Sequence, residues 1–160
     1  MISVVIPLYN KGPHIAKTLD SVLAQTVPPA EIIVVDDGST DDGPEVVRRY
    51  LDRGVRLIQQ ANDGVSVARN RGVEEAACEH VAFLDADDWW MPNHIETLAR
   101  LIQQYPQAGL YSTAHLIYRD QIYVRPRSSY ADGWVGLVDD FFSLCTGACA
   151  CQFHYGLRKA

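Results

Sequence analysis

Short apolar runs alternate with amphipathic segments over the first hundred residues of the chain. Apolar, β-branched runs that end at turn residues are typical of strands buried in a sheet. The predicted strands are residues 3–7, 31–35, 55–58 and 81–84. Helical spacing of apolar residues between them predicts helices over residues 15–23, 44–51, 67–73 and 92–105. This alternation predicts an α/β fold with a mostly parallel central sheet and helices on both of its faces.

The pattern changes after Gly109. Residues 110–114 predict an added strand, and residues 116–118 and 122–124 predict a hairpin joined at residues 119–121. A last helix is expected from the apolar residues Trp134, Leu137, Val138, Phe141 and Phe142.

The composition favours a single globular domain. The chain has 160 residues, 48% of them hydrophobic, and a formal charge of −6. This acidic balance argues against a nucleic-acid-binding face, which needs clustered Lys and Arg. No apolar stretch has the length of a membrane span, and no basic segment followed by an apolar one opens the chain. We therefore expect a cytoplasmic protein without a transmembrane segment, with peripheral attachment to the inner face of the membrane left open.

Three acidic residues stand where the fourth apolar run ends, in the segment Asp85-Ala86-Asp87-Asp88. Alternation along an extended chain would send Asp85 and Asp87 to the same side. Carboxylates gathered in this way repel one another unless a cation lies among them, and Mg²⁺ or Mn²⁺ prefers such oxygen ligands together with substrate phosphate. The alternative is a helix N-cap with acidic residues in the first turn, which needs fewer carboxylates. We favour a metal and phosphate site.

Polar clusters follow three of the predicted strands, at Tyr9-Asn10, Asp36-Asp37 and residues 85–87. In open α/β sheets, ligands bind beyond the carboxyl ends of the strands. Three segments that are distant in the sequence are therefore expected to meet at one edge of the sheet and to form one site.

Four segments carry a family resemblance in their order: residues 4–10, 34–41, 64–72 and 83–88. They read VVIPLYN, VVDDGSTD, GVSVARNRG and FLDADD, and together they closely resemble the amino-terminal part of family 2 glycosyltransferases. The resemblance covers about 110 residues, and four motifs in order are far more specific than one. It implies the GT-A fold, a Rossmann-like three-layer α/β/α sandwich. It also implies one domain over residues 1–160, with a nucleotide-sugar-binding part up to residue 110 and the beginning of an acceptor-side part after it.

The resemblance implies inverting transfer of a sugar from a nucleotide diphosphate sugar, usually a UDP-sugar, to a hydroxyl of a saccharide, lipid-linked or protein acceptor, as in polysaccharide biosynthesis. Pro7 and Tyr9 match positions that line the nucleoside pocket, where the tyrosine ring packs on the base. Asp37 matches the carboxylate that accepts a hydrogen bond from the uracil N–H, with Asp36 beside it. The alternatives are a core aromatic for Tyr9 and a turn and cap cluster for the two acids.

Three further positions match the phosphate and metal end of the site. Arg69 matches a basic residue that reaches the base or diphosphate, and its alternative is a solvated helix face. Asp85 and Asp87 match the family's Asp-x-Asp motif. By that resemblance Asp85 lies against the ribose and the metal, and Asp87 is the main ligand of Mg²⁺ or Mn²⁺.

We find no catalytic base in the sequence. The family usually carries it in a later Glu-Asp or similar acidic motif, and no Glu-Asp pair follows Asp88. The later acids include Asp132, Asp139 and Asp140, and a solvated helix face explains the last two. We therefore expect a fragment that lacks the base and is inactive alone. The alternative is a non-catalytic nucleotide-sugar-binding module.

Other classes of protein fit less well. A nucleotidyltransferase of similar fold would need a Gly-rich, basic loop after the first strand, and a dehydrogenase would need Gly-x-Gly-x-x-Gly there; residues 8–12 match neither. A zinc site built from Cys145, Cys149, Cys151 and His154 has unfamiliar spacing, so we expect ordinary thiols.

Overall fold

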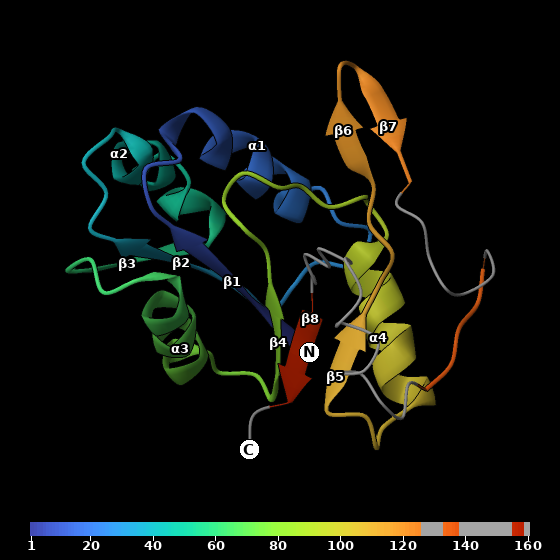
Figure 1. The fold of residues 1–160 in the computed structure, drawn as a ribbon. Coiled ribbons are helices and arrows are strands. Elements are labelled where there is room, and N and C mark those ends of the chain that lie inside the picture. Colours follow the sequence, from blue (N-terminus) through green and yellow to red (C-terminus); the bar gives the residue numbers. More distant parts are fainter. Residues whose placement is uncertain (126–132, 138–154, 159–160) are drawn as a thin grey trace.

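The computed structural model describes residues 1–125, 133–137 and 155–158. Within these residues the main element is a six-stranded sheet of order β3-β2-β1-β4-β8-β5 (Figure 1). Its parallel strands are β1 (Ile2–Leu8), β2 (Glu31–Asp37), β3 (Val55–Gln60) and β4 (His80–Phe83). Strand β8 (Tyr155–Arg158) runs antiparallel between β4 and β5 (Leu110–Ser112). The predicted α/β fold with a mostly parallel central sheet is confirmed.

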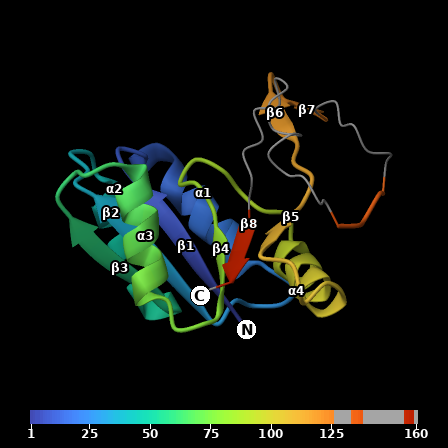
Figure 2. The same ribbon diagram turned by 60° about the horizontal axis from the view of Figure 1, so that its bottom comes forward.

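Helices cover both faces of the parallel strands (Figures 1 and 2). The helices are α1 (Gly12–Leu23), α2 (Gly43–Arg48), α3 (Val65–Glu75) and α4 (His94–Gln104), with a short 3₁₀ helix at Leu51–Arg53. Helices α1 and α2 lie on one face of β1 and β2, and α3 lies on the other. Pro44 stands at the start of α2, where a missing N–H costs nothing.

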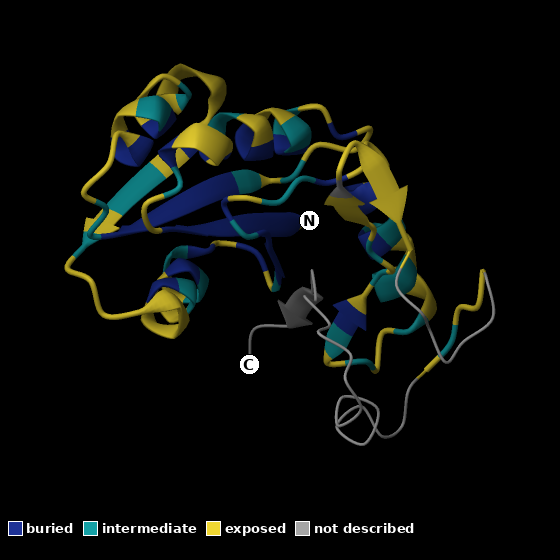
Figure 3. Ribbon diagram, turned by 45° about the horizontal axis from the view of Figure 1, so that its top comes forward, coloured by how far each residue is buried: buried dark blue, intermediate teal, exposed yellow. Residues whose placement is uncertain are grey.

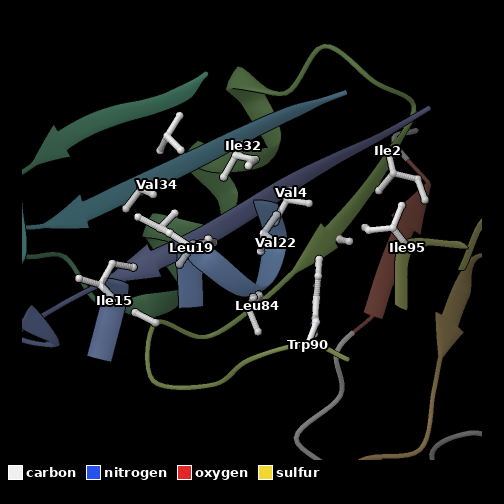
Figure 4. Close-up of a cluster of buried hydrophobic side chains, with 14 of the residues drawn as sticks. Ile2, Val4, Ile15, Leu19, Val22, Ile32, Val34, Leu84, Trp90 and Ile95 are labelled. Carbon is white, nitrogen blue, oxygen red and sulfur yellow. The ribbon is translucent and has the colours of Figure 1, made fainter. Parts of the chain in front are cut away.

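Alternating residues of β1 and β2 divide the core into two layers. Val4 and Val34 face α1, whereas Val5 and Ile33 face α3. Ile15, Leu19 and Val22 of α1 fill the first layer together with Leu84, Trp90 and Ile95, as Figure 4 shows. Strand β1 is therefore buried along its whole length, and β2 is buried at every residue except Glu31 (Figure 3). Because these strands are fixed on both faces, their carboxyl ends make a rigid base for a site.

Helix α3 approaches β1 very closely at Gly72. A Cβ atom added there would lie 2.2 Å from Cγ1 of Val5, far inside contact distance. Only glycine fits this position without displacement of the helix. The same helix carries Arg69 one turn earlier.

Several boundaries differ from those expected. Strand β1 continues through Pro7 to Leu8, and Asp36 and Asp37 are the last residues of β2 rather than loop residues. Strand β8 was not expected, because its residues come from the other end of the chain. The predicted last helix is wrong over 133–137, which form no helix, and its residues Val138, Phe141 and Phe142 lie outside the described residues.

The predicted hairpin is present as β6 (Ile117–Arg119) and β7 (Ile122–Val124). Asp120 and Gln121 join the strands with φ values of 51° and 64°, as a two-residue hairpin turn of type I′ requires. No helix in the described part of the chain has both the length and the low polarity needed to cross a bilayer.

Candidate functional site

The segments that follow β1, β2 and β4 meet at the carboxyl edge of the sheet. Asn10 joins the first two, because its N–H donates to Ser39 Oγ at 3.0 Å and its Oδ1 accepts from the Thr40 N–H at 2.8 Å. Asn10 has φ of 51°, a left-handed conformation that Asn tolerates. Lys11 joins the first segment to the third through Asp87. The structure thus brings together the three segments that the sequence analysis placed at one edge.

The acidic segment is a turn rather than an extended strand. Strand β4 ends at Phe83, and the Asp88 N–H donates to the Asp85 carbonyl at 3.0 Å. Asp85 and Asp87 therefore do not alternate along an extended chain, and that part of our reasoning was wrong. The two carboxylates contact different cations: Asp85 Oδ1 lies 2.6 Å from Arg69 Nη2, and Asp87 Oδ2 lies 2.7 Å from Lys11 Nζ.

Lys11 is a site residue that we did not predict. Its hydrogen bond to Asp87 and the negative charges of Asp87, Asp85 and Asp88 together hold the Lys11 pKa above its ordinary value, although burial opposes this. One ammonium group thus lies in the field of all three carboxylates. The available signal was a lysine placed directly after the polar end of the first strand.

Helix α1 holds the acidic turn in place through hydrogen bonds. The hydroxyl of Thr18 is fully buried and lies 2.9 Å from the Ala86 carbonyl oxygen and 2.8 Å from that of Asp88. Ser21 and Gln25 bind the backbone of the next part of the loop at residues 90 and 91, and Gln25 also accepts from the N–H of Ile95 in the first turn of α4. The turn is therefore held by a helix that is itself packed on the sheet.

Asp37 and Asp36 are both buried, with 3% and 2% of their surface exposed. Asp37 accepts hydrogen bonds from the Gln60 side chain and from the N–H groups of Asp63 and Gly64. Burial tends to raise the pKa of Asp37, but these three donors outweigh it and hold that pKa below its ordinary value. A carboxylate has about four acceptor positions, so one position of Asp37 is left for another donor.

Asp36 accepts fewer hydrogen bonds than Asp37. It accepts from the Ser39 N–H at 3.0 Å and from the Gln59 side chain at 3.0 Å. Both acids therefore organise the loops around them, in agreement with the turn and cap alternative. This role is compatible with a second role in ligand binding for Asp37.

The remaining predicted site residues lie along the same edge. Pro7 is buried in β1 opposite Val35, whereas Tyr9 is 47% exposed and is not a core aromatic. The Arg69 side chain is only 28% exposed, and its Nε is buried without a hydrogen-bond partner among the described residues. A solvated helix face therefore does not describe Arg69.

Trp89 connects the acidic turn to the hairpin. Lys17 Nζ lies 3.1 Å from the centroid of the Trp89 ring, and Tyr118 of β6 meets the same ring edge-on at 5.7 Å. Trp90, by contrast, is buried in the core and stacks on His94. Trp89 thus packs against Lys17 and the hairpin, and Trp90 packs in the core.

A divalent metal fits this arrangement only in partnership with a ligand. In the described part of the chain no three His, Cys, Asp or Glu side chains are grouped to hold a metal ion. Mg²⁺ is commonly held by one or two carboxylates together with substrate phosphates, and Asp85 and Asp87 meet that lower requirement. The Lys11 ammonium already lies against Asp87 as a cation would. The later acids Asp132, Asp139 and Asp140, and the cluster Cys145, Cys149, Cys151 and His154, lie outside the described residues.

Solved structures with a similar fold are glycosyltransferases. The chain superposes on TarS 1–349 of S. aureus in complex with UDP-GlcNAc with a TM-score of 0.63 and 30% identity, covering 68% of this chain and 32% of TarS. It superposes on the mannosyltransferase PcManGT of Pyrobaculum calidifontis, in complex with GDP-Man and Mn²⁺, with a TM-score of 0.63 and 31% identity, covering 75% and 36%. Both are GT-A glycosyltransferases.

Curated relatives agree with the structural neighbours. The glycosyltransferase YibD of Escherichia coli is 48% identical over 99 residues, which are 61% of this chain and 29% of YibD. The putative teichuronic acid biosynthesis glycosyltransferase TuaG of Bacillus subtilis is 34% identical over 123 residues, which are 75% of this chain and 49% of TuaG. The chain thus spans less than half the length of either relative. The family model for glycosyl transferase family 2 matches residues 3–152, and the chain belongs to this family.

Proposed function

We propose that the protein binds a UDP-sugar with Mg²⁺ or Mn²⁺ and takes part in inverting transfer of the sugar to an acceptor hydroxyl. The observation that carries the proposal is the pairing of two carboxylates with two cations at the carboxyl edge of the sheet, Asp85 with Arg69 and Asp87 with Lys11. A bound metal ion can replace Lys11 or Arg69 as the cation beside a carboxylate, and a diphosphate can replace a carboxylate as the anion beside Lys11 or Arg69.

The nucleoside end of the proposed site lies at β1 and β2. Tyr9 is exposed at this edge and can receive a base on its ring, beside the buried Pro7. Asp37 keeps one acceptor position for the N–H of a uracil. Asp36 holds the Ser39 loop that Asn10 also contacts, and so positions the backbone beside the proposed nucleoside site.

The phosphate end lies at the acidic turn. Asp87 and Asp85 would hold the metal ion, which, when bound, stabilises the negative charge of the departing nucleoside diphosphate. Arg69 is fixed beside Asp85 and supplies a guanidinium in a partly buried place, where it adds to this stabilisation without reorganising. Thr18 keeps the turn in position through its backbone carbonyls.

The complexes of TarS with UDP-GlcNAc and of PcManGT with GDP-Man and Mn²⁺ support a nucleotide-sugar donor and a divalent ion. The acceptor, a saccharide, a lipid-linked saccharide or a protein, remains part of the proposal. The second candidate is a non-catalytic nucleotide-sugar-binding module, favoured by the lack of a Glu-Asp pair after Asp88.

Calorimetry of UDP binding with and without Mn²⁺ tests the donor site. UDP is expected to bind with Mn²⁺ and to lose at least about tenfold in affinity when Mn²⁺ is removed or when Asp87→Asn removes the main ligand. Asp52→Asn, an equal change at an exposed residue of the 3₁₀ helix, should leave binding unchanged. UDP affinity that is equal with and without Mn²⁺, and equal in Asp87→Asn, would refute the metal assignment.

A screen of nucleotide sugars by thermal shift identifies the donor, since a ligand that binds only the folded state raises the melting temperature. Turnover of the stabilising donor with added acceptors then separates the two candidates. Little or no sugar transfer is expected from these 160 residues, because we find no base in them. Robust transfer would exclude the non-catalytic module and would show that a base has been missed.

A further inference from the structure

We infer that Lys11 is an internal counter-ion for Asp87, which a divalent ion must displace, and that it thereby couples metal binding to nucleotide binding. The inference rests on the proposed function, because it concerns the same metal site. It assigns Lys11 a positioning role that the motif resemblance did not include.

The first support is that Lys11 is held in place by its backbone. It is the N-cap residue of α1, and its carbonyl accepts hydrogen bonds from the N–H groups of His14 and Ile15 at 2.9 and 3.0 Å. On its other side the Gly12 N–H donates to Asp41 Oδ2 at 2.8 Å. With both flanks fixed, the side chain of Lys11 extends from a fixed point toward the acidic turn, 76 positions later in the chain.

The second support is competition for one carboxylate oxygen. Lys11 Nζ lies 2.7 Å from Asp87 Oδ2, within the first contact layer of that oxygen, where a bound metal ion would also lie. A divalent ion at Asp87 would meet a positive charge only a few ångströms away, and such like charges repel one another. The ion therefore binds well only if the ammonium moves away.

The third support is that the other carboxylate is also occupied. Asp85 Oδ1 contacts Arg69 Nη2 at 2.6 Å, so both proposed ligands are neutralised by cations of the protein. No third acidic, His or Cys ligand in the described residues strengthens the site. A nucleotide diphosphate changes this balance, because its oxygens offer new ligands to the metal and a new anionic partner to the displaced ammonium.

The consequence is reciprocal coupling between the two ligands. If the diphosphate relieves the competition at Asp87, UDP must tighten Mn²⁺ binding, and Mn²⁺ must tighten UDP binding by the same factor. Removal of the Lys11 charge should abolish part of this coupling by improving the binding of Mn²⁺ alone. A residue that merely stabilised the fold would not improve metal affinity when it is replaced.

The test measures binding of Mn²⁺ alone, from the loss of the free-ion electron paramagnetic resonance signal on titration of the protein. Lys11→Met is expected to tighten this binding about threefold to tenfold, the range expected for removing one exposed cation near a divalent ion. Lys11→Arg keeps the positive charge and should bind Mn²⁺ as the wild type does. Lys17→Met is the matched control, since it removes the same charge from α1 where the ammonium contacts Trp89 rather than an acid.

The same titration with saturating UDP gives the coupling factor for each protein. We expect this factor to fall at least about threefold in Lys11→Met and to be unchanged in Lys11→Arg and Lys17→Met. Circular dichroism should give the same spectrum for all four proteins, and a Lys11→Met protein that is unfolded would assign Lys11 a structural role and overturn the inference.

The possible results separate the inference from the proposed function. If Lys11→Met binds Mn²⁺ no more tightly than the wild type, or if Lys17→Met improves binding equally, Lys11 is not a local counter-ion and the inference is wrong. If the wild type binds UDP with no dependence on Mn²⁺, the proposed metal site fails, and the inference fails with it.

Discussion

Replacement of Asp37 by Asn should destabilise the protein far more than the same change at Asp36. Both residues are buried, with 3% and 2% of their surface exposed, but their donors differ. Asp37 accepts two backbone N–H groups, from Asp63 at Oδ1 and from Gly64 at Oδ2. Asn has one oxygen, so its NH₂ group would face one of these N–H groups, and neither can turn away.

The magnitude follows from the bonds that are lost. A hydrogen bond to a charged group contributes about 1.5–3 kcal/mol, and a buried donor left without an acceptor costs a similar amount, so Asp37→Asn should cost about 3 kcal/mol. Asp36 accepts only one backbone N–H, from Ser39, and its other donor is the Gln59 side-chain amide, which can rotate once its exposed hydrogen bond from Arg48 is given up. Asp36→Asn should therefore cost less than about 1 kcal/mol.

Urea denaturation at neutral pH measures both free energies of unfolding. For a domain of this size each kcal/mol lowers the melting temperature by about 2–4 °C, so Asp37→Asn should lower it by about 6–12 °C. The m-value should stay constant, because neither change alters the surface exposed on unfolding. Equal costs for the two variants, or a larger cost at Asp36, would refute the reasoning from backbone donors.

The pH dependence gives a second check on Asp37. Its pKa lies below the ordinary value of 3.8, so ionised Asp37 contributes stability in full above that value. This contribution is lost as the pH falls through the lower, folded-state pKa. The difference between wild type and Asp37→Asn should therefore be constant from neutral pH to about pH 4 and shrink only below it. A difference that disappeared between pH 7 and about pH 5 would contradict the assignment.

Two further substitutions test how the helices hold the site. Thr18→Val keeps the shape of the side chain but removes the one hydroxyl hydrogen that the carbonyls of Ala86 and Asp88 share, so it should cost about 1–2 kcal/mol and weaken UDP–Mn²⁺ binding severalfold in calorimetry. Unchanged stability and binding would show that Thr18 does not hold the acidic turn. Gly72→Ala places a methyl group 2.2 Å from Val5 Cγ1 and should lower the free energy of unfolding in urea by about 1–3 kcal/mol. Combining it with Val5→Ala should recover part of that loss. If the free-energy changes of the two substitutions simply add in the double variant, the two residues are not in direct contact.

The strands and the main helices could be predicted because each carries its own periodic signal. The runs that became β1 and β2 are apolar on both faces, and such runs have few alternatives to a buried parallel strand. Helix α4 likewise shows its apolar stripe in residues such as Ile95 and Leu98. The placement of polar clusters at the carboxyl edge followed from the parallel order of the strands.

The contacts that build the site could not be predicted in the same way. The pairing of Lys11 with Asp87 joins residues 76 positions apart, and no local pattern specifies which carboxylate an exposed ammonium will meet. The acidic turn was misjudged because the strand signal does not say at which residue pairing ends, and β4 ends at Phe83. Strand β8 pairs with β4 through residues near the other end of the chain, so its place depends on tertiary packing alone.

Helix α1 explains why a site made of loops can still be rigid. Its apolar residues Ile15, Leu19 and Val22 pack on the sheet, and this burial fixes the rotation of the helix about its axis (Figure 4). Thr18 is buried beside that apolar stripe, so the same rotation directs its hydroxyl to the acidic turn. Lys11 begins the helix and is carried along with it. Core packing therefore determines the positions of both Thr18, which holds the acidic turn, and Lys11, which pairs with Asp87. A core substitution such as Leu19→Ala should consequently lower metal and nucleotide affinity as well as the free energy of unfolding.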